Sequence, residues 1–337
     1  MNRKQPRIPA HFDADKVDKI WKVNYQQLAE DARKWADEYK LTPAVDDKFK
    51  IALVLVDVQN TFCNPEFELF VGGRSGRGAI DDNIRLCEFI YRNLDIITEI
   101  IPTMDTHQAA QIFHSLFLLN DNGEHPKPNT LISYDDIKNG VWKINPDVLK
   151  FLSFNEEKAQ QHLIHYTKTL KDKSKYDLTI WPYHAMLGGI GHALVPSVEE
   201  AIFYHSIARY SQPDFQIKGR NPLTEHYSVF GPEIRTDADG NKIADKNSPL
   251  LEKLMKYDLI LIAGQAKSHC VAWTIDDLLQ EDKSFAKKVY LLEDVTSPVV
   301  IPGVIDFTEE TDKAFKKFAD AGMHVVKTSD AVEEWMV

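Results

Sequence analysis

The sequence contains no long apolar run and few cysteines. No stretch reaches the roughly 18–20 consecutive apolar residues that a membrane-spanning helix needs, and the first ten residues lack the apolar core of a secretion signal. The three cysteines, Cys63, Cys87 and Cys270, are odd in number and widely spaced, which argues against a disulfide framework and for a reducing compartment. With 43% hydrophobic residues, the 337-residue chain is expected to be a globular protein of the cytoplasm.

Positive charge and nucleotide-binding motifs are also missing. The formal net charge of −11 argues against nucleic acids and anionic membrane surfaces as partners. The glycines between residues 72 and 78 match neither the GxGxxG pattern of dinucleotide folds nor a phosphate loop. Nucleic acids, membrane surfaces and nucleotides are therefore not expected as partners, and the sequence leaves open whether the chain forms a homo-oligomer.

Short apolar runs predict six β-strands, at residues 51–57, 99–104, 214–218, 259–263, 289–293 and 324–327. Helical patterns separate most of them, and this alternation predicts an α/β fold with a mostly parallel, doubly wound sheet. Residues 1–48 are interpreted as a leader with a helix from about residue 15 to 39. The main domain is expected over 49–337, interrupted at about 118–176 by an insertion with short helices.

Three residues of complementary chemistry stand at the ends of predicted strands: Asp57, Lys218 and Cys270. Ligands gather at the carboxyl ends of parallel strands. A cysteine nucleophile needs a proton acceptor, which Asp57 can be, and a positive neighbour, which Lys218 can be. Singly, each residue also has a structural interpretation, such as a buried apolar role for Cys270. One shared site explains all three more economically.

A second group is formed by Asp105, His107 and His184, with His114 as a further candidate. An Asp and a His on alternate residues can ligate one metal ion, and a distant His can complete an open site. Because 12 histidines allow chance pairings, spacing alone leaves this interpretation open.

Several segments resemble the isochorismatase-like cysteine hydrolases, and nicotinamidases in particular. The resemblance spans roughly residues 50–117 and 177–330 and occurs in the family's order. It rests on Leu55–Cys63, on Lys218–Pro222 with Tyr227–Phe230, and on the nucleophile motif Gly264–Val271 with Thr274 and Asp277.

This resemblance implies a triad of Cys270, Asp57 and Lys218 that forms a thioester with the acyl group and releases ammonia or an amine. It also implies a cis peptide bond between Gln265 and Ala266, with the amides of Ala266 and Cys270 forming an oxyanion hole.

The resemblance further implies a metal at Asp105, His107 and His184 that holds a pyridine nitrogen. Zinc is the first choice, with iron or manganese as alternatives. Phe62 and Trp181 match positions that sandwich the nicotinamide ring, and Tyr227 is expected at the pocket edge. The imidazole of His269, beside the nucleophile, is expected to point away from the site.

The implied activity is hydrolysis of nicotinamide to nicotinate and ammonia, a step of NAD salvage. The alternative is a related cysteine amidase for a larger amide or carbamoyl compound, because the insertion could reshape the pocket mouth. Two further hypotheses are a non-catalytic binding protein and a zinc hydrolase in which the metal group activates water directly.

Overall fold

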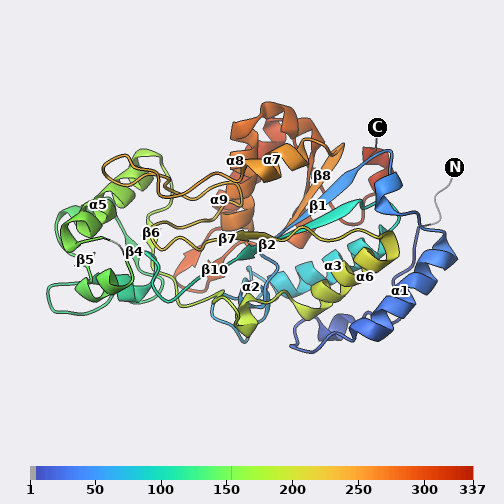
Figure 1. Ribbon diagram of the computed structural model, residues 1–337, viewed down its shortest axis with the longest axis horizontal. Helices are drawn as coiled ribbons and strands as arrows, with labels where there is room; N and C mark the ends of the chain where they lie inside the picture. The colour runs from blue at the N-terminus through green and yellow to red at the C-terminus, as the bar shows by residue number, and fades with distance from the viewer. Residues whose placement is uncertain (1–4, 153, 337) are drawn as a thin grey trace.

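The computed structural model describes residues 5–152 and 154–336. Residues 1–4 of the predicted leader, residue 153 of the predicted insertion and residue 337 lie outside the described residues. At its centre is a six-stranded sheet in the order β12-β9-β8-β1-β2-β7 (Figure 1), in which every neighbouring pair is parallel. The strands are β1 (Ile51–Val56), β2 (Glu99–Asp105), β7 (Gln216–Lys218), β8 (Leu259–Gly264), β9 (Val289–Leu292) and β12 (His324–Val326). The predicted fold class is confirmed.

Helices cover both faces of this sheet (Figure 1). One face carries α1 (Tyr25–Tyr39), α3 (Gly78–Arg92) and α6 (Pro196–Arg209), and the other carries α7 (Ser248–Leu254), α8 (Ala272–Glu281) and α9 (Thr308–Asp320). Side chains alternate along a strand, so β1 serves both cores: Leu53 packs toward the first group of helices and Val54 toward the second. Burial on both faces explains why β1 and β8 are continuously apolar in sequence.

A third core lies beside the sheet, in the region of residues 112–181. It contains β3 (Leu118–Leu119), β4 (Leu131–Ile132), α4 (Tyr134–Lys138), β5 (Lys143–Ile144), α5 (Glu156–Asp172) and β6 (Leu178–Thr179). Strand β3 pairs with β5 and β4 with β6, both antiparallel. The expectation of short helices is wrong for α5, which has 17 residues and a side-chain cap from Asn155. The division of the chain into leader, domain and insertion stays a prediction.

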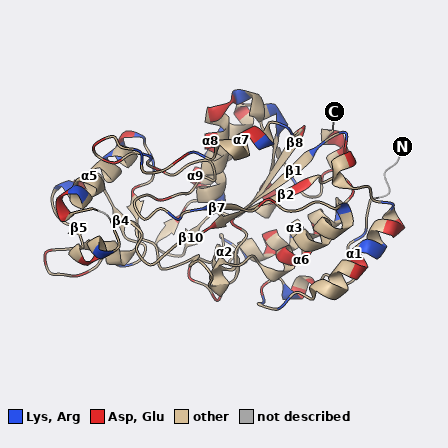
Figure 2. Ribbon diagram, viewed as in Figure 1, with Lys and Arg blue, Asp and Glu red and all other residues tan. Residues whose placement is uncertain are grey.

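Two further features frame the site. A short helix, α2 (Asn60–Cys63), follows β1, and a hairpin of β10 (Val300–Ile301) and β11 (Ile305–Asp306) precedes α9. In Figure 2, acidic and basic residues alternate along the visible helices. Among the described residues, no helix combines the length and apolar character needed to cross a membrane.

Glycine is required where β8 ends. Gly264 has φ +116°, and a Cβ added to it would lie 2.1 Å from the carbonyl oxygen of Val56 on β1. A side chain at this position would therefore separate two strands of the central sheet. The close approach fixes the path of the chain into the turn that carries Cys270.

Candidate active site

The ammonium group of Lys218 lies among three predicted site residues. Its Nζ is 2.9 Å from Oδ2 of Asp57, 3.1 Å from Oδ1 of Asp105 and 3.6 Å from Sγ of Cys270. Lys218 also donates a hydrogen bond to the carbonyl oxygen of His226 (2.9 Å). All of these side chains are buried. Because the residues come from the ends of β1, β2 and β7 and from the turn after β8, the parallel topology itself brings them together.

The orientation of Asp57 is fixed by its backbone and by one neighbour. Its φ of +47° is unusual for a residue other than glycine, although Asp tolerates it better than most. The amide of Asp57 donates to Oγ1 of Thr103 (3.0 Å), and this hydroxyl donates to Oδ1 of the carboxylate (2.5 Å). Oδ2 is left to face Lys218.

Burial dominates the ionisation of the group. It raises the pKa of Asp57, although the charge of Lys218 acts in the opposite direction. It also raises the pKa of the Cys270 thiol, again against Lys218. For Lys218 itself, burial lowers the pKa, but Asp105 and Asp57 outweigh it and hold the pKa well above the usual value. Burial thus favours the neutral thiol over the thiolate, and the raised pKa of Asp57 makes its carboxylate a better proton acceptor.

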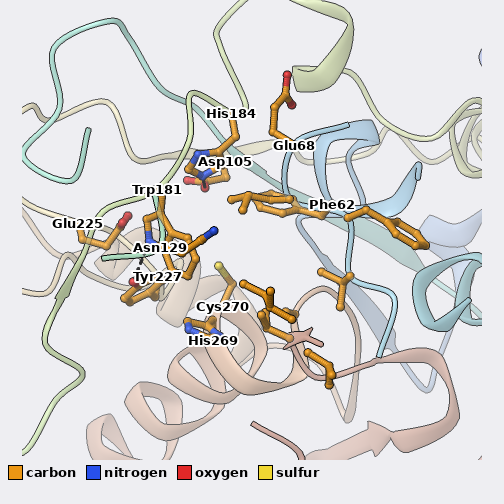
Figure 3. Close-up of a pocket in the computed structure, with 17 residues that line it drawn as sticks. Phe62, Glu68, Asp105, Asn129, Trp181, His184, Glu225, Tyr227, His269 and Cys270 are labelled. Atoms are coloured by element: carbon orange, nitrogen blue, oxygen red, sulfur yellow. Dashed lines mark hydrogen bonds and ion pairs between the residues drawn. The ribbon is translucent and has the colours of Figure 1, made fainter. Parts of the chain in front are cut away.

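A pocket of about 210 Å³ opens above Cys270. Phe62, Trp181 and Tyr227 line it, as do Ala266 and Cys270, whereas Asp57 and Lys218 lie beneath the thiol and outside its lining. Figure 3 shows Phe62 and Trp181 on opposite sides with Cys270 below them. The indole Nε1 of Trp181 donates to the hydroxyl of Tyr227 (3.2 Å). This hydrogen bond fixes the indole of Trp181 relative to the ring of Tyr227.

The turn before the thiol differs from the expected helix start. The peptide bond Gln265–Ala266 is cis, as the resemblance implied. A π-helical turn, Lys267–Val271, then precedes α8. The expectation that His269 points away is wrong, because the wider π turn lets both His269 and Cys270 line the pocket.

Other pocket residues carried no signal in the sequence. They come from distant parts of the chain and are Glu68, Leu69, Phe70, Val71, Asn129, Glu225, Val299, Val300 and Ile301. Glu225, between the recognised segments 218–222 and 227–230, and residues 68–71, shortly after Cys63, are near enough to these segments for their sequence position to have suggested them. Asn129 and the β10 hairpin reach the pocket through tertiary folding alone.

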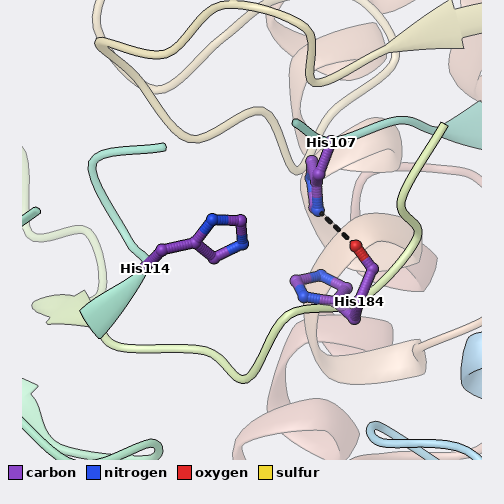
Figure 4. A group of neighbouring side chains, drawn as sticks. All are labelled: His107, His114 and His184. Atoms are coloured by element: carbon purple, nitrogen blue, oxygen red, sulfur yellow. Dashed lines mark hydrogen bonds between the residues drawn. The ribbon is translucent and has the colours of Figure 1, made fainter. Parts of the chain in front are cut away.

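Three histidines face one another beside the pocket (Figure 4). One ring nitrogen each of His107, His114 and His184 lies within 4.8 Å of the others. In each ring, Nδ1 contacts a backbone carbonyl: His107 that of His184 (3.3 Å), His114 that of Ala109 (3.1 Å) and His184 that of Pro182 (2.8 Å). Such contacts leave Nε2 free as a ligand atom. Among the described residues, Nε2 of His114 has no hydrogen-bond partner.

Asp105 completes this group. Its Oδ1 is 3.0 Å from Nε2 of His107, and its Oδ2 is 3.7 Å from Nε2 of His184. Two ligands that each lie about 2.0–2.2 Å from one ion are separated by about this distance. Gly219 (φ +86°) leaves the necessary space, since an added Cβ would lie 2.7 Å from Oδ1 of Asp105.

The electrostatics also fit a metal. Burial lowers the pKa of His107 and lowers that of His114 to about 3, so both rings are neutral, as ligands must be. Burial disfavours the charged form of Asp105, but His107 and Lys218 outweigh it and hold its pKa well below the usual value. The structure thus brings all four predicted ligands together, and a set of imidazoles and one carboxylate suits zinc, iron or manganese.

No protein-family model matches the chain, and no curated protein sequence does. Solved structures do match, and they show which fold the chain has: it shares the α/β fold of the yeast nicotinamidase Pnc1p. The yeast nicotinamidase Pnc1p bound to the inhibitor nicotinaldehyde has a TM-score of 0.51 at 18% identity, over 82% of this chain and 99% of that one. A second structure of yeast Pnc1p has a TM-score of 0.50 at 19% identity, with the same coverage.

A pyrazinamidase of Pyrococcus horikoshii in complex with zinc is also similar. It has a TM-score of 0.45 at 16% identity, over 82% of this chain and 99% of that one. At such identities the likeness concerns the fold, and the activity has to be argued from the site.

Proposed function

We propose that the protein is a cysteine amidase that hydrolyses nicotinamide to nicotinate and ammonia through a thioester on Cys270. The observation that carries this proposal is the position of Lys218, whose Nζ lies 3.6 Å from the thiol and 2.9 Å from Asp57 beneath an aromatic pocket. The fold shared with yeast nicotinamidase supports it. We assign the activity to NAD salvage in the cytoplasm.

Asp57 is the proton acceptor in the first half-reaction. It takes the thiol proton as Sγ of Cys270 attacks the amide carbonyl, and the ammonium of Lys218 stabilises the negative charge that develops on sulfur. The amides of Ala266 and Cys270 are proposed to donate to the oxyanion, where one donor is typically worth about 10²–10³ in kcat. Asp57 then returns the proton to the leaving nitrogen, the C–N bond breaks, and ammonia departs.

The second half-reaction uses the same residues. Asp57 removes a proton from water, which attacks the thioester carbonyl and breaks the C–S bond. Nicotinate leaves, and the proton held by Asp57 returns to the sulfur of Cys270. The carboxylate therefore alternates between acceptor and donor, a role that suits its raised pKa.

Phe62 and Trp181 are proposed to hold the ring by stacking, with Tyr227 fixing the indole. A divalent ion held by Asp105, His107 and His184, with His114 as a further ligand, would supply a Lewis-acid contact for the ring nitrogen when bound. We propose zinc, with iron or manganese as alternatives. Asp105 also contacts Lys218, so this group and the nucleophile share one charge network.

Incubation of the pure protein with nicotinamide, with ammonia and nicotinate measured together, tests the proposal. We expect turnover by the wild type and by Cys63→Ala, and none by Cys270→Ala. Cys63 is the matched control, because it is buried and free but outside the pocket lining. Rapid quenching should reveal an acyl adduct on Cys270. Absence of nicotinamide turnover beside turnover of another amide would refute the proposed substrate.

A further inference from the structure

A second cavity adjoins the reaction pocket. It has a volume of about 80 Å³ and shares four lining residues with the pocket above Cys270: Asn129, Trp181, Val299 and Ile301. We call this space the outer cavity. Because the same side chains border both spaces, a ligand with its reacting group at Cys270 can extend past Asn129 into the outer cavity.

The walls of the outer cavity are apolar. Apart from Asn129 and Thr179, every residue that lines it has an apolar side chain. Leu131 on β4 and Val304 between β10 and β11 line only the outer cavity, and they are 52% and 69% exposed. Exposed apolar surface beside a reaction pocket favours ligand binding, because covering this surface with an apolar group removes it from water.

Hydrogen bonds connect the segments that line the outer cavity to their neighbours, including the turn that carries Cys270. On one side, β4 pairs with β6, and the backbone amide of Asn129 donates to the carbonyl of Ile180 (2.6 Å). On the other side, the amide of Val299 donates to Oγ of Ser268 (3.1 Å), next to His269 in the turn that carries Cys270. The cavity is therefore built from ordered backbone on both sides.

Asn129 stands at the junction of the two spaces. Its φ of +69° is a left-handed conformation that Asn adopts more easily than most residues. Figure 3 shows its side chain directed into the pocket beside Trp181. A ligand that spans both spaces must pass this carboxamide.

We propose that the outer cavity is a binding subsite for a short apolar group carried by the amide substrate. The proposal rests on the proposed amidase function, because the reacting carbonyl has to lie at Cys270. The apolar group is carried either on the aromatic ring or on the amide nitrogen, and both give the same chemistry at the cavity wall. The substrate class is thereby an aromatic amide with a short alkyl substituent.

The test compares kcat/KM for nicotinamide with that for two series, ring-alkylated and N-alkylated nicotinamides with one to three carbons. In the wild type we expect kcat/KM to rise about threefold to fourfold for each methylene that becomes buried, in one of the two series. Which series gains identifies the position of the substituent. A flat or falling response in both series would overturn the proposal.

Two variants fill the outer cavity from opposite walls, Val304→Trp and Leu131→Trp. Each should abolish the gain while kcat/KM for nicotinamide stays within about twofold of the wild type. Val45→Trp is the control, since Val45 is 84% exposed and lies outside the cavity lining. A gain that persists in both filled variants would overturn the subsite.

Calorimetry separates this proposal from the proposed function. The same amides are titrated into Cys270→Ala, and into Cys270→Ala combined with each filled variant. If the wild type hydrolyses no amide but binding still tightens with alkyl length and is weakened by Val304→Trp, the amidase function fails and the subsite holds. If binding does not depend on alkyl length, the subsite fails whatever the turnover.

Discussion

Gln265 donates a hydrogen bond from its side-chain amide to Oδ2 of Asp82, a buried acid of α3, at 2.9 Å. The carbonyl oxygen of the same side chain accepts from the amide of Ser297 (3.3 Å), and Oδ1 of Asp82 pairs with Arg85 (2.9 Å). The residue that precedes Ala266 is thus fixed from two directions. Because Ala266 lines the pocket beside the thiol, Asp82 is placed to act as a positioning residue for the proposed oxyanion hole.

Replacement of Asp82 by Ala should lower kcat for nicotinamide about tenfold and change KM little. The loss follows from a less fixed Ala266 amide, and it should be smaller than the 10²–10³ for removal of a whole donor. Asp82→Asn, which keeps an acceptor oxygen, should recover part of the rate. The control is Asp81→Ala, one residue away on the same helix and paired with Arg77 at the surface. Equal effects of Asp81→Ala and Asp82→Ala would contradict the positioning role.

Lys218→Met should slow alkylation of Cys270 by iodoacetamide at neutral pH about tenfold or more. The positive charge of Lys218 lowers the pKa of the thiol, so its removal leaves less thiolate. Peptide mapping after timed labelling measures the rate at Cys270 alone. Lys288→Met serves as control, because Lys288 donates to the carbonyls of Met255 and Tyr257 and lies outside the pocket lining. An unchanged rate would show that Lys218 does not influence the thiol.

The pH dependence of kcat/KM should show an acidic limb set by Asp57. The carboxylate must be ionised to accept the thiol proton, and burial raises its pKa. Activity is therefore full above this raised pKa and is lost as the pH falls through it, at a higher pH than the usual Asp value of about 3.9.

Thr103→Val tests whether Asp57 sets the acidic limb, because it should shift that limb in a defined direction. The hydroxyl of Thr103 lowers the pKa of Asp57 by hydrogen bonding, so its loss should move the acidic limb to still higher pH. Thr98→Val is the control, since Thr98 is paired with Asp47, away from the site. A limb that moves to lower pH in Thr103→Val would argue that Asp57 is not the titrating group.

Metal analysis of the purified protein should find about one divalent ion per chain. His107→Ala and His184→Ala should each lose most of it, because removal of a ligand from an imidazole and carboxylate site weakens binding strongly. His114→Ala decides whether this residue is a ligand: it should lower the metal content if Nε2, which lacks a hydrogen-bond partner among the described residues, binds the ion. His125→Ala, at an exposed loop, should keep the full content. Full content in all four variants would exclude this site.

The sheet and the proximity of Asp57, Lys218 and Cys270 could be predicted because their signals are local. Each of Asp57, Lys218 and Cys270 follows a run with strand character, and parallel strands bring their carboxyl ends together whatever lies between them. The bounds of β1 and β8 were predicted to within one residue, because a strand buried on both faces is a continuous apolar run.

The orientation of His269, the length of α5 and the outer cavity depend on structure that local sequence patterns do not specify. His269 faces the pocket only because a π turn replaces the start of an α-helix, and apolar periodicity does not distinguish the two. The length of α5 was hidden because buried polar residues, His162 and Thr167, interrupt its apolar stripe. Asn129 and Val304 line the outer cavity but come from segments that carry no chemical motif, so the outer cavity could not be predicted from the sequence.

The ammonium of Lys218 contacts both Asp57 and Asp105. The effects on kcat/KM of substitutions at Asp57 and at Asp105 should therefore be non-additive, since each substitution changes the charge near Lys218 that the other residue experiences. A double-mutant cycle across Asp57 and Asp105 would measure this coupling directly. If Asp105 and the histidines are exchanged for another ligand set, in design or in evolution, we accordingly expect a compensating change near Cys270.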